Sequence, residues 1–382
     1  MPADIRTPTA LPLDDAVLRA VDRALAALRR GEPVAILSAD GTPALALGME
    51  SVTPDSVETL KRLAGGGAPV LALTRRRALV LGLPAADSGA VVLSQTGGIA
   101  VETALALADP EMGNGPTLPP GLSAVPAPVG CAAAAAVDLA KLARLLPAAV
   151  LVPVALPPGG DMAAWCERHD VLTVTARHVE DYRVHVVRSL RRVADARVPL
   201  DGAEDTRVVA FRPADGGPEY LAIVIGEPDP AQPVLARLHS ECFTGDLLGS
   251  LRCDCGEQLR GAIREISTAG SGVLLYLAQE GRGIGLVNKL RAYRLQDRGF
   301  DTVDANELLG FEADERVYLP AAEMLRQLGY GRVRLMTNNP EKLRQLARCG
   351  IEVVERVPHI FPSNGHNAAY LRTKAERSGH MF

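Results

Sequence analysis

Short apolar runs alternate with longer stretches of helical periodicity in the first half of the chain. The predicted elements are strands at 33–37, 69–73 and 148–154 and helices at 16–30 and 132–146. Because strands that alternate with helices usually form a sheet covered by helices, we predict a mixed or parallel sheet. Between Pro110 and Pro128 glycines and prolines are dense and neither periodicity holds, so this segment is predicted to be a loop.

A second series of strands and helices begins where the composition shifts towards Arg and Asp, around residues 182–201. Its predicted strands are 207–211, 220–226, 234–239, 272–277, 333–336 and 352–356, and its predicted helices are 285–296, 319–328, 340–348 and 367–377. Pro340 and Gly350 suit the first turn and the end of one of these helices. We predict a mixed α/β (α+β) fold in two domains, residues 1–190 and 191–382.

The composition excludes several classes of protein. With 47% apolar and 23% charged residues, the chain is typical of a soluble globular protein. The longest apolar stretch, 145–158, is too short for a membrane helix and contains prolines, and the first residues show no secretory pattern. We therefore expect a cytoplasmic protein with no membrane partner. The net charge of −4 gives no reason to expect a nucleic-acid partner, so any phosphate site must be local.

Three of the six cysteines are close together in the sequence and form the pattern C-x10-C-x-C: Cys242, Cys253 and Cys255. Three thiolates suit zinc, and three protein ligands leave a position for water, as in catalytic zinc sites. Two alternatives remain on spacing alone. The site could be structural, with a distant fourth ligand such as His239 or His366, or the cysteines could be ordinary buried residues.

Three polar segments are candidates for binding or catalysis. Residues 279–285 contain closely spaced glycines between a predicted strand and helix, where backbone N–H groups can face an anion, although a plain tight turn fits equally well. Asp314 could act as a general base beside Arg316, or the two could be a solvated charge pair. Residues 337–342 open a helix with Lys342 in its first turn, which suits an anion, but simple N-capping by Asn338 or Asn339 explains the same pattern.

Taken together and in this order, these segments resemble GTP cyclohydrolase II, the family that starts riboflavin biosynthesis from GTP. The resemblance covers about residues 186–382. The strings that carry it are 237–242, 250–256, 279–285, 288–289 with 291–293, 313–316 and 337–342.

The resemblance implies a catalytic zinc ion on Cys242, Cys253 and Cys255, and a zinc-activated water that attacks carbon 8 of guanine, after which formate is lost. Tyr293 matches the tyrosine that lies near this water. The implied GTP-binding residues are Arg237, Leu238, His239, Ser240, Glu241, Gln258, Glu280, Gly281, Arg282, Thr302, Thr337 and Lys342. The family also implies a homodimer.

The resemblance further implies cleavage between the α- and β-phosphates, with Arg316 as nucleophile and Asp314 as its base, while Mg2+ neutralises the triphosphate and the leaving pyrophosphate. Because a guanidinium is always protonated, electrostatic stabilisation by Arg316 is the rival role. Two departures from the family are expected to alter rate or phosphate binding only. Ala278 stands where many members have a basic residue, and residues 362–365 replace a more basic loop before His366.

The first half is faintly similar to 3,4-dihydroxy-2-butanone-4-phosphate synthase in residues 25–37, 52–73 and 135–154. That family needs an acidic loop for magnesium and a His-Thr-Glu string. Here residues 38–44 keep one carboxylate, Asp40, and residues 132–134 are all alanine. We therefore expect this domain to be catalytically inactive and to serve folding, dimerisation or regulation.

The leading hypothesis is a GTP cyclohydrolase II that converts GTP and water to 2,5-diamino-6-(5-phosphoribosylamino)pyrimidin-4(3H)-one, formate and pyrophosphate. One alternative is an enzyme that stops at the formylated pyrimidine. Another is a non-catalytic protein that senses GTP by binding it. A third is a bifunctional enzyme whose first half makes the butanone phosphate through residues that the motifs do not reveal.

Overall fold

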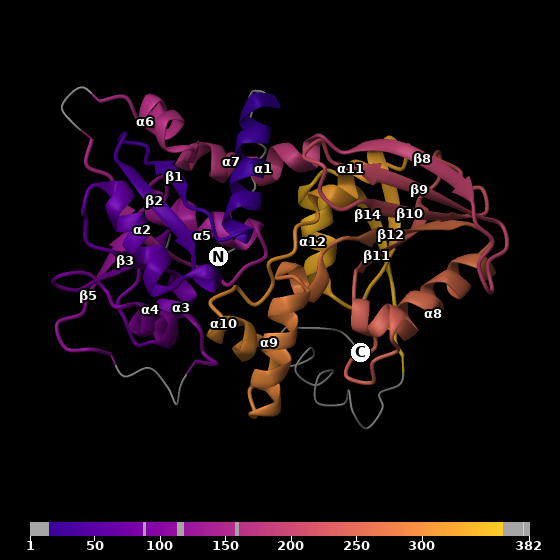
Figure 1. The fold of residues 1–382 in the computed structure, drawn as a ribbon. Helices are drawn as coiled ribbons and strands as arrows, with labels where there is room; N and C mark the ends of the chain where they lie inside the picture. The colour runs from indigo at the N-terminus through magenta and orange to yellow at the C-terminus, as the bar shows by residue number, and fades with distance from the viewer. Residues whose placement is uncertain (1–14, 87–88, 113–117, 157–159, 362–376, 378–382) are drawn as a thin grey trace.

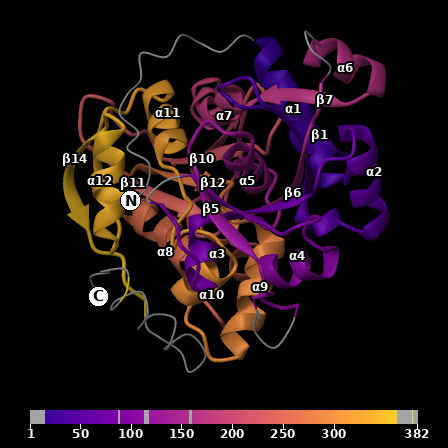
Figure 2. The ribbon, with the colours of Figure 1, turned by 90° about the vertical axis from the view of Figure 1, so that its left-hand side faces the viewer.

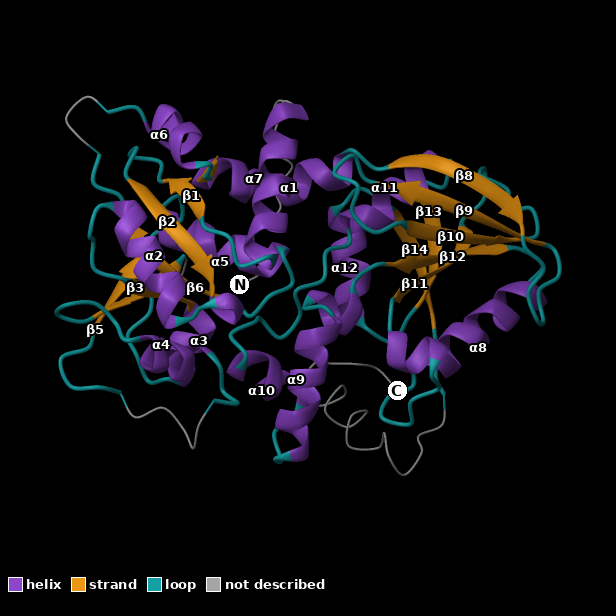
Figure 3. Ribbon diagram, viewed as in Figure 1, coloured by secondary structure: helices purple, strands orange, loops and turns teal. Residues whose placement is uncertain are grey.

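The computed structural model describes residues 15–86, 89–112, 118–156, 160–361 and 377. Two lobes lie side by side, and each contains a seven-stranded sheet with helices around it (Figures 1 and 3). Helix α7, Ala176–Arg188, leads from the first lobe to the second. In the described part of the chain, no helix is both long and apolar enough to cross a membrane.

The first sheet has the strand order β5-β4-β3-β6-β2-β1-β7. Its strands are β1 Val34–Leu37, β2 Pro43–Gly48, β3 Val70–Thr74, β4 Ala90–Ser94, β5 Ser123–Ala127, β6 Ala148–Pro153 and β7 Leu172–Thr175. Strands β1 and β7 are parallel, and the other neighbours are antiparallel. The predicted mixed sheet is therefore confirmed.

Helices cover both faces of this sheet because alternate strand residues point to opposite sides. Val34 and Ile36 share a buried core with α1 (Asp15–Arg29), α5 (Ala132–Leu142) and α7. Ala35, which lies between them, belongs to a second core. The helices of that second core are α2 Pro54–Ala64, α3 Arg75–Val80, α4 Val101–Ala108 and α6 Met162–His169.

The second sheet has the order β14-β13-β11-β12-β10-β9-β8. Its strands are β8 Arg191–Arg197, β9 Thr206–Arg212, β10 Tyr220–Ile225, β11 Val234–Ser240, β12 Gly272–Leu277, β13 Arg332–Met336 and β14 Glu352–Val357. Strands β14, β13, β11 and β12 run parallel, and the rest of the sheet is antiparallel. Helix α8 (Cys255–Thr268) packs on one face, and α11 (Leu319–Gln327) and α12 (Pro340–Arg348) pack on the other.

Helices α9 (Leu286–Asp297) and α10 (Thr302–Leu308) lie next to α3 and α4 of the first lobe in both views (Figures 1 and 2). Leu295 and Phe311 from this part of the chain are buried in the same core as Leu71 of β3. The hydrophobic core of the first lobe is therefore completed by residues of the second. The domain boundary near residue 190 stays a prediction, although the second sheet begins at Arg191.

Most predicted elements are confirmed to within a few residues, and the exceptions have physical reasons. The segment predicted as a loop between Pro110 and Pro128 contains β5, an edge strand that is largely exposed and so lacks a clear apolar pattern. Strand β8 is exposed along its whole length and was not predicted for the same reason. Helix α5 ends four residues earlier than predicted because Arg144 adopts a left-handed conformation, with φ of 60°. The helix predicted at 367–377 lies outside the described residues, apart from Arg377.

Candidate functional site

The candidate site lies where three neighbouring parallel strands end. The chain leaves β11 towards Cys242, leaves β12 towards Gln279, and leaves β13 at Thr337. Because the carboxyl ends of parallel strands meet at one edge of the sheet, three distant sequence segments converge there. This edge is also where ligands usually bind in open α/β sheets.

One cavity at this edge collects almost all of the predicted site residues. Those that line it are Arg237, Leu238, His239, Ser240, Glu241, Cys242, Cys253, Cys255, Gln258, Glu280, Gly281, Arg282, Tyr293, Thr302, Arg316, Thr337 and Lys342. Asp314 is not among the lining residues, but it pairs with Arg316, which is. The structure thus brings the residues implied by the resemblance into one place, while their individual roles stay predictions.

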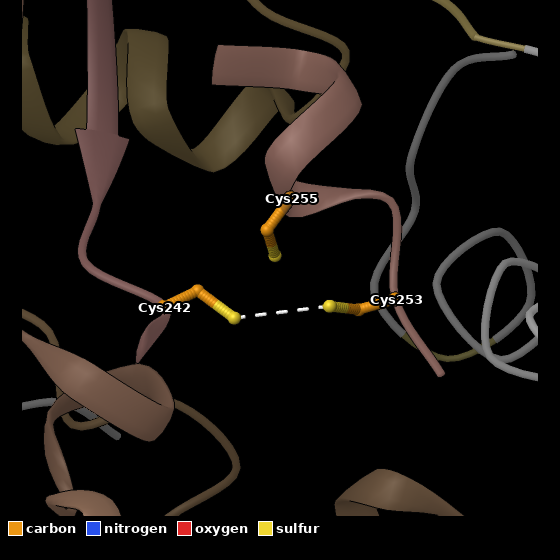
Figure 4. Close-up of side chains that lie close together, drawn as sticks. All are labelled: Cys242, Cys253 and Cys255. Atoms are coloured by element: carbon orange, nitrogen blue, oxygen red, sulfur yellow. Dashed lines mark hydrogen bonds between the residues drawn. The ribbon is translucent and has the colours of Figure 1, made fainter. Parts of the chain in front are cut away.

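The three predicted metal ligands point towards one another (Figure 4). Cys242 follows β11, and Cys255 is the first residue of α8. The three sulfur atoms all lie within 4.8 Å of one another, and the sulfurs of Cys242 and Cys253 are 3.7 Å apart. A tetrahedral zinc ion with Zn–S bonds of about 2.3 Å holds thiolates roughly 3.8 Å apart, so the cluster fits zinc.

No fourth protein ligand joins this cluster within the described part of the chain. His239, one of the two alternative ligands, instead has Nε2 at 3.0 Å from Asp246 Oδ1. Its ring is buried, and burial lowers the pKa of His239 below the ordinary value although Asp246 opposes this. The other alternative, His366, lies outside the described residues. Three thiols suit a catalytic zinc site that keeps a position for water, and this assignment stays a prediction.

A glycine makes room for the thiols. Gly245 lies in the π-helical turn Phe243–Leu247 that follows Cys242. A Cβ atom at this position would lie 2.8 Å from the sulfur of Cys253 and 3.0 Å from the sulfur of Cys242. Both distances are shorter than an ordinary van der Waals contact of about 3.5–4.0 Å. Any other residue at position 245 would therefore displace the thiol cluster.

Lys289 of α9 is a site residue that the sequence reasoning did not single out, although it lies in one of the strings that carry the resemblance. Its Nζ donates to Cys242 Sγ at 3.1 Å, to Thr244 Oγ1 at 2.9 Å and to Glu280 Oε1 at 2.8 Å. Burial lowers the pKa of Lys289, but Glu280 and Cys242 outweigh burial and raise it above the usual range. The ammonium group therefore stays charged beside the sulfur of Cys242.

The thiol of Cys242 is also the most acidic of the three. Hydrogen bonds with Cys253 and Cys255 hold the pKa of Cys242 far below its usual value, and Lys289 lowers it further against the effect of burial. The same bonds raise the pKa values of Cys253, to about 11, and of Cys255.

Asp246 is a second residue that the sequence reasoning missed. Its carboxylate accepts a hydrogen bond from the backbone N–H of Cys242 at 2.9 Å and one from Tyr276 Oη at 2.9 Å. It also lies against His239, as described above. Asp246 therefore fixes the backbone of one predicted metal ligand. No sequence motif indicates this role, because it depends on the fold around the residue.

Two buried polar atoms in the cavity have no protein partner among the described residues, the Nε of Arg237 and the Oγ of Ser240. The rest of the Arg237 guanidinium is well held, with donations to Met336 O at 2.8 Å and to Gln258 Oε1 at 2.6 Å. Burial lowers the pKa of Arg237 to about 10, so it is cationic at neutral pH. Because buried polar atoms are normally hydrogen-bonded, these two are ready to bond a ligand.

Tyr293 lies between cationic groups. The guanidinium of Arg252 stacks over its ring at 4.5 Å, and Lys289 Nζ lies 5.7 Å from the ring centre. Burial raises the pKa of Tyr293, so its hydroxyl keeps its proton at neutral pH. Arg252 is held in turn by Asp297, at 2.6 Å. Arg252 was not predicted as a site residue.

Arg316, which lines the cavity, forms an ion pair with Asp314 through two hydrogen bonds. Arg316 Nε donates to Asp314 Oδ1 at 2.8 Å, and Nη2 donates to Oδ2 at 2.5 Å. Burial raises the pKa of Asp314, but the charge of Arg316 outweighs this and lowers it below the ordinary value. The charge pair is the arrangement expected for an arginine that stays cationic, rather than one that acts as a neutral nucleophile.

The segment 337–342 caps α12 and also lines the cavity, while its role in anion binding stays a prediction. Asn339 caps α12 by accepting a hydrogen bond from Glu341 N at 2.9 Å, whereas Asn338 bonds the backbone of His359 instead. Capping by Asn339 is therefore confirmed. Thr337 and Lys342 are both buried at the cavity, and Lys342 Nζ donates to Leu238 O at 2.8 Å.

The site combines three clustered thiols with a cavity that is lined by cationic side chains, an arrangement that can hold a metal ion and an anionic ligand. A family model described as GTP cyclohydrolase II matches residues 191–358. The chain is 68% identical to GTP cyclohydrolase-2 of Azospirillum brasilense over 382 residues, which is 100% of this chain and 99% of that protein. The chain belongs to the GTP cyclohydrolase II family, an enzyme family of riboflavin biosynthesis.

Two further similarities are weaker or shorter. The riboflavin biosynthesis protein RibBA of Synechocystis is 45% identical over 255 residues, which cover 65% of this chain and 46% of that protein. The crystal structure of RibBX, a two domain 3,4-dihydroxy-2-butanone 4-phosphate synthase from A. baumannii, has a TM-score of 0.37 and 18% identity, covering 90% of this chain and 99% of that chain. The proposed inactivity of the first half stays a prediction.

Proposed function

We propose that this enzyme is zinc-dependent and converts GTP and water to 2,5-diamino-6-(5-phosphoribosylamino)pyrimidin-4(3H)-one, formate and pyrophosphate. The observation that carries the proposal is the position of the three thiols, Cys242, Cys253 and Cys255. They lie in the same cavity as the predicted GTP-binding residues, at a spacing that suits zinc. When bound, zinc would lower the pKa of a water molecule towards neutrality and so supply the nucleophile for carbon 8 of guanine.

The surrounding residues support this chemistry without further cofactors for the ring-opening step. Lys289 donates a hydrogen bond to Cys242 Sγ and places a positive charge beside the thiol cluster. Tyr293, whose hydroxyl is protonated, offers a proton donor beside the thiols. Arg237 and Ser240 offer buried donors that have no protein partner among the described residues, and these would orient the substrate.

For the phosphate end we propose that Arg316 stabilises charge at the α-phosphate and that Asp314 holds it in place. The two hydrogen bonds between these side chains support this role over nucleophilic attack by the arginine. Mg2+ would accompany the triphosphate and neutralise the leaving pyrophosphate. The proposed assembly is a homodimer.

We further propose that the first lobe has no synthase activity. Its one carboxylate in residues 38–44, Asp40, accepts a hydrogen bond from Thr42 N at 2.9 Å and is exposed. Residues 132–134 begin the buried helix α5 and carry no polar side chain. A hard cation and an enolising base would both lack ligands or donors there.

Zinc dependence is tested by removing and restoring the metal. Protein treated with a chelator should lose formate release from GTP, and one equivalent of zinc per subunit should restore it. A Cys253→Ser variant should neither retain zinc nor recover, whereas Cys349→Ser, at a cysteine outside the cavity, should behave like the wild type. Full formate release by metal-free protein would refute the proposal.

A further inference from the structure

The first lobe forms hydrogen bonds and ion pairs with the two loops that carry Glu280–Gly283 and Asp314–Arg316. We call residues 278–285 the glycine loop and residues 308–317 the arginine loop. Side chains of the first lobe hold the arginine loop through four contacts. These are Thr74 Oγ1 to Gly310 O at 2.6 Å, Arg77 Nη1 to Leu308 O at 2.8 Å, Arg76 Nε to Glu312 Oε2 at 2.7 Å and Lys141 Nζ to Glu315 Oε1 at 2.7 Å.

Of these four contacts, the ion pair between Lys141 and Glu315 is the one nearest to Arg316 in the sequence. Lys141 belongs to α5 of the first lobe, and Glu315 stands between Asp314 and Arg316 in the chain. Both side chains are largely buried, 17% and 12% exposed, so the pair is shielded from water. The charge of Lys141 outweighs burial and holds the pKa of Glu315 below its usual value.

Glu315, which Lys141 holds, also bonds residues of both loops. Its Oε1 also accepts a hydrogen bond from Glu312 N at 3.0 Å, which fixes the turn that precedes Arg316. Its own backbone N–H donates to Arg282 O at 3.0 Å, and Arg282 Nη1 donates to Ala313 O at 3.1 Å. The two loops are therefore tied together at a residue that the first lobe holds.

Arg144, which follows α5, clamps the glycine loop directly. It is one of three non-glycine residues in the described chain with positive φ, a conformation that persists only where the surroundings enforce it. Its Nη2 donates to Ala278 O at 3.0 Å, and its carbonyl accepts from Asn288 Nδ2 at 3.1 Å. A Cβ atom at Gly285 would lie 3.1 Å from Arg144 Cβ, so the two backbones are closely packed.

We propose that the first lobe is a positioning element for the GTP site, and that Lys141 and Arg144 are its positioning residues. Lys141 acts through Glu315 on Arg316, and Arg144 acts through Ala278 and Asn288 on the glycine loop. The inference rests on the proposed role of Arg316 in turnover. It gives the first lobe a function in this enzyme that requires no chemistry of its own.

The test replaces Lys141 in the full-length protein and follows both turnover and the motion of the arginine loop. Lys141→Met should lower kcat for GTP by roughly 10- to 100-fold, because displacing a catalytic group by about 1 Å costs rate on this scale. Zinc content should stay at the wild-type level, and amide exchange in residues 308–317 should become faster. Lys141→Arg should restore most of the rate, since it keeps the charge.

Two further variants make the test decisive. Lys61→Met removes a lysine that pairs with Glu58 on α2, in the first lobe, and should leave kcat and the exchange of 308–317 unchanged. The double variant Lys141→Glu with Glu315→Lys restores the ion pair but not the hydrogen bond from Glu312 N, so it should recover part of the turnover that either single reversal loses. Unchanged kcat and exchange in Lys141→Met, or equal effects in Lys61→Met, would overturn the inference. Absence of GTP turnover in the wild type would instead count against the proposed function, and the exchange data would still decide the role of Lys141.

Discussion

Replacing Gly245 by alanine tests the thiol cluster without removing any ligand. The φ angle of Gly245 is not positive, so alanine can adopt its backbone conformation. The effect of the substitution therefore depends only on the space for the added Cβ. That Cβ would lie 2.8 Å from Cys253 Sγ and 3.0 Å from Cys242 Sγ. The sulfurs would have to move away by roughly 0.5–1.2 Å to reach an ordinary contact distance.

Overpacking of this kind typically costs about 1–3 kcal/mol. If this free energy is lost from the zinc-bound state, zinc affinity falls by roughly 5- to 150-fold, since each 1.4 kcal/mol changes Kd about tenfold. Competition with a chromogenic chelator measures the affinity, and metal analysis of the purified protein gives the occupancy. The control is Gly331→Ala, because Gly331 also lacks positive φ and a Cβ there would meet nothing within 4 Å. Wild-type zinc affinity in Gly245→Ala would refute the assignment of the thiols as a tight metal site.

Three other outcomes follow from the geometry. Tyr293→Phe should bind zinc like the wild type but lower kcat by roughly 10²-fold, as expected for loss of a proton donor. If metal analysis finds no zinc in purified Tyr293→Phe, the role of Tyr293 is structural instead. Arg316→Lys should keep part of the activity if the residue acts by its charge, whereas a nucleophilic role predicts complete loss of pyrophosphate release. Lys141→Met should lower the free energy of unfolding at pH 7 by about 1–3 kcal/mol. The pKa of Glu315 is lowered in the folded protein, so its ion pair contributes fully to stability above the unfolded pKa of about 4.3. This contribution is lost as the pH falls through the folded pKa of Glu315. The denaturation midpoints of wild type and Lys141→Met should therefore converge in acid.

The sequence was most informative about the second lobe, where local patterns and chemistry coincide. The strands β11, β12 and β13 are apolar and buried, so their ends could be located, and with them the polar segments that follow. The spacing of Cys242, Cys253 and Cys255 already indicated zinc. The spacing does not show that His239 stays out of the thiol cluster. Its ring bonds Asp246 instead, a contact that depends on the fold.

The contacts between the lobes could not be predicted from the sequence. Lys141 and Arg144 are charged residues in segments without a motif, and the string 313–316 implies no role for Glu315. Only the packing of α9 and α10 into the first lobe brings these residues to their partners. The exposed edge strands β5 and β8 were missed because burial, which produces the alternating apolar pattern, is absent there. Interactions that depend on tertiary packing produce no recognisable local sequence pattern.

The most direct test of the central claim is the product balance from GTP. Zinc-loaded wild-type protein is incubated with GTP and magnesium, and formate, pyrophosphate and the nucleotide product are followed by mass, with Cys253→Ser alongside. The account predicts equal amounts of formate, pyrophosphate and the deformylated pyrimidine from the wild type, and none from the variant. A product that keeps its formyl group, or GTP binding without turnover, would contradict it.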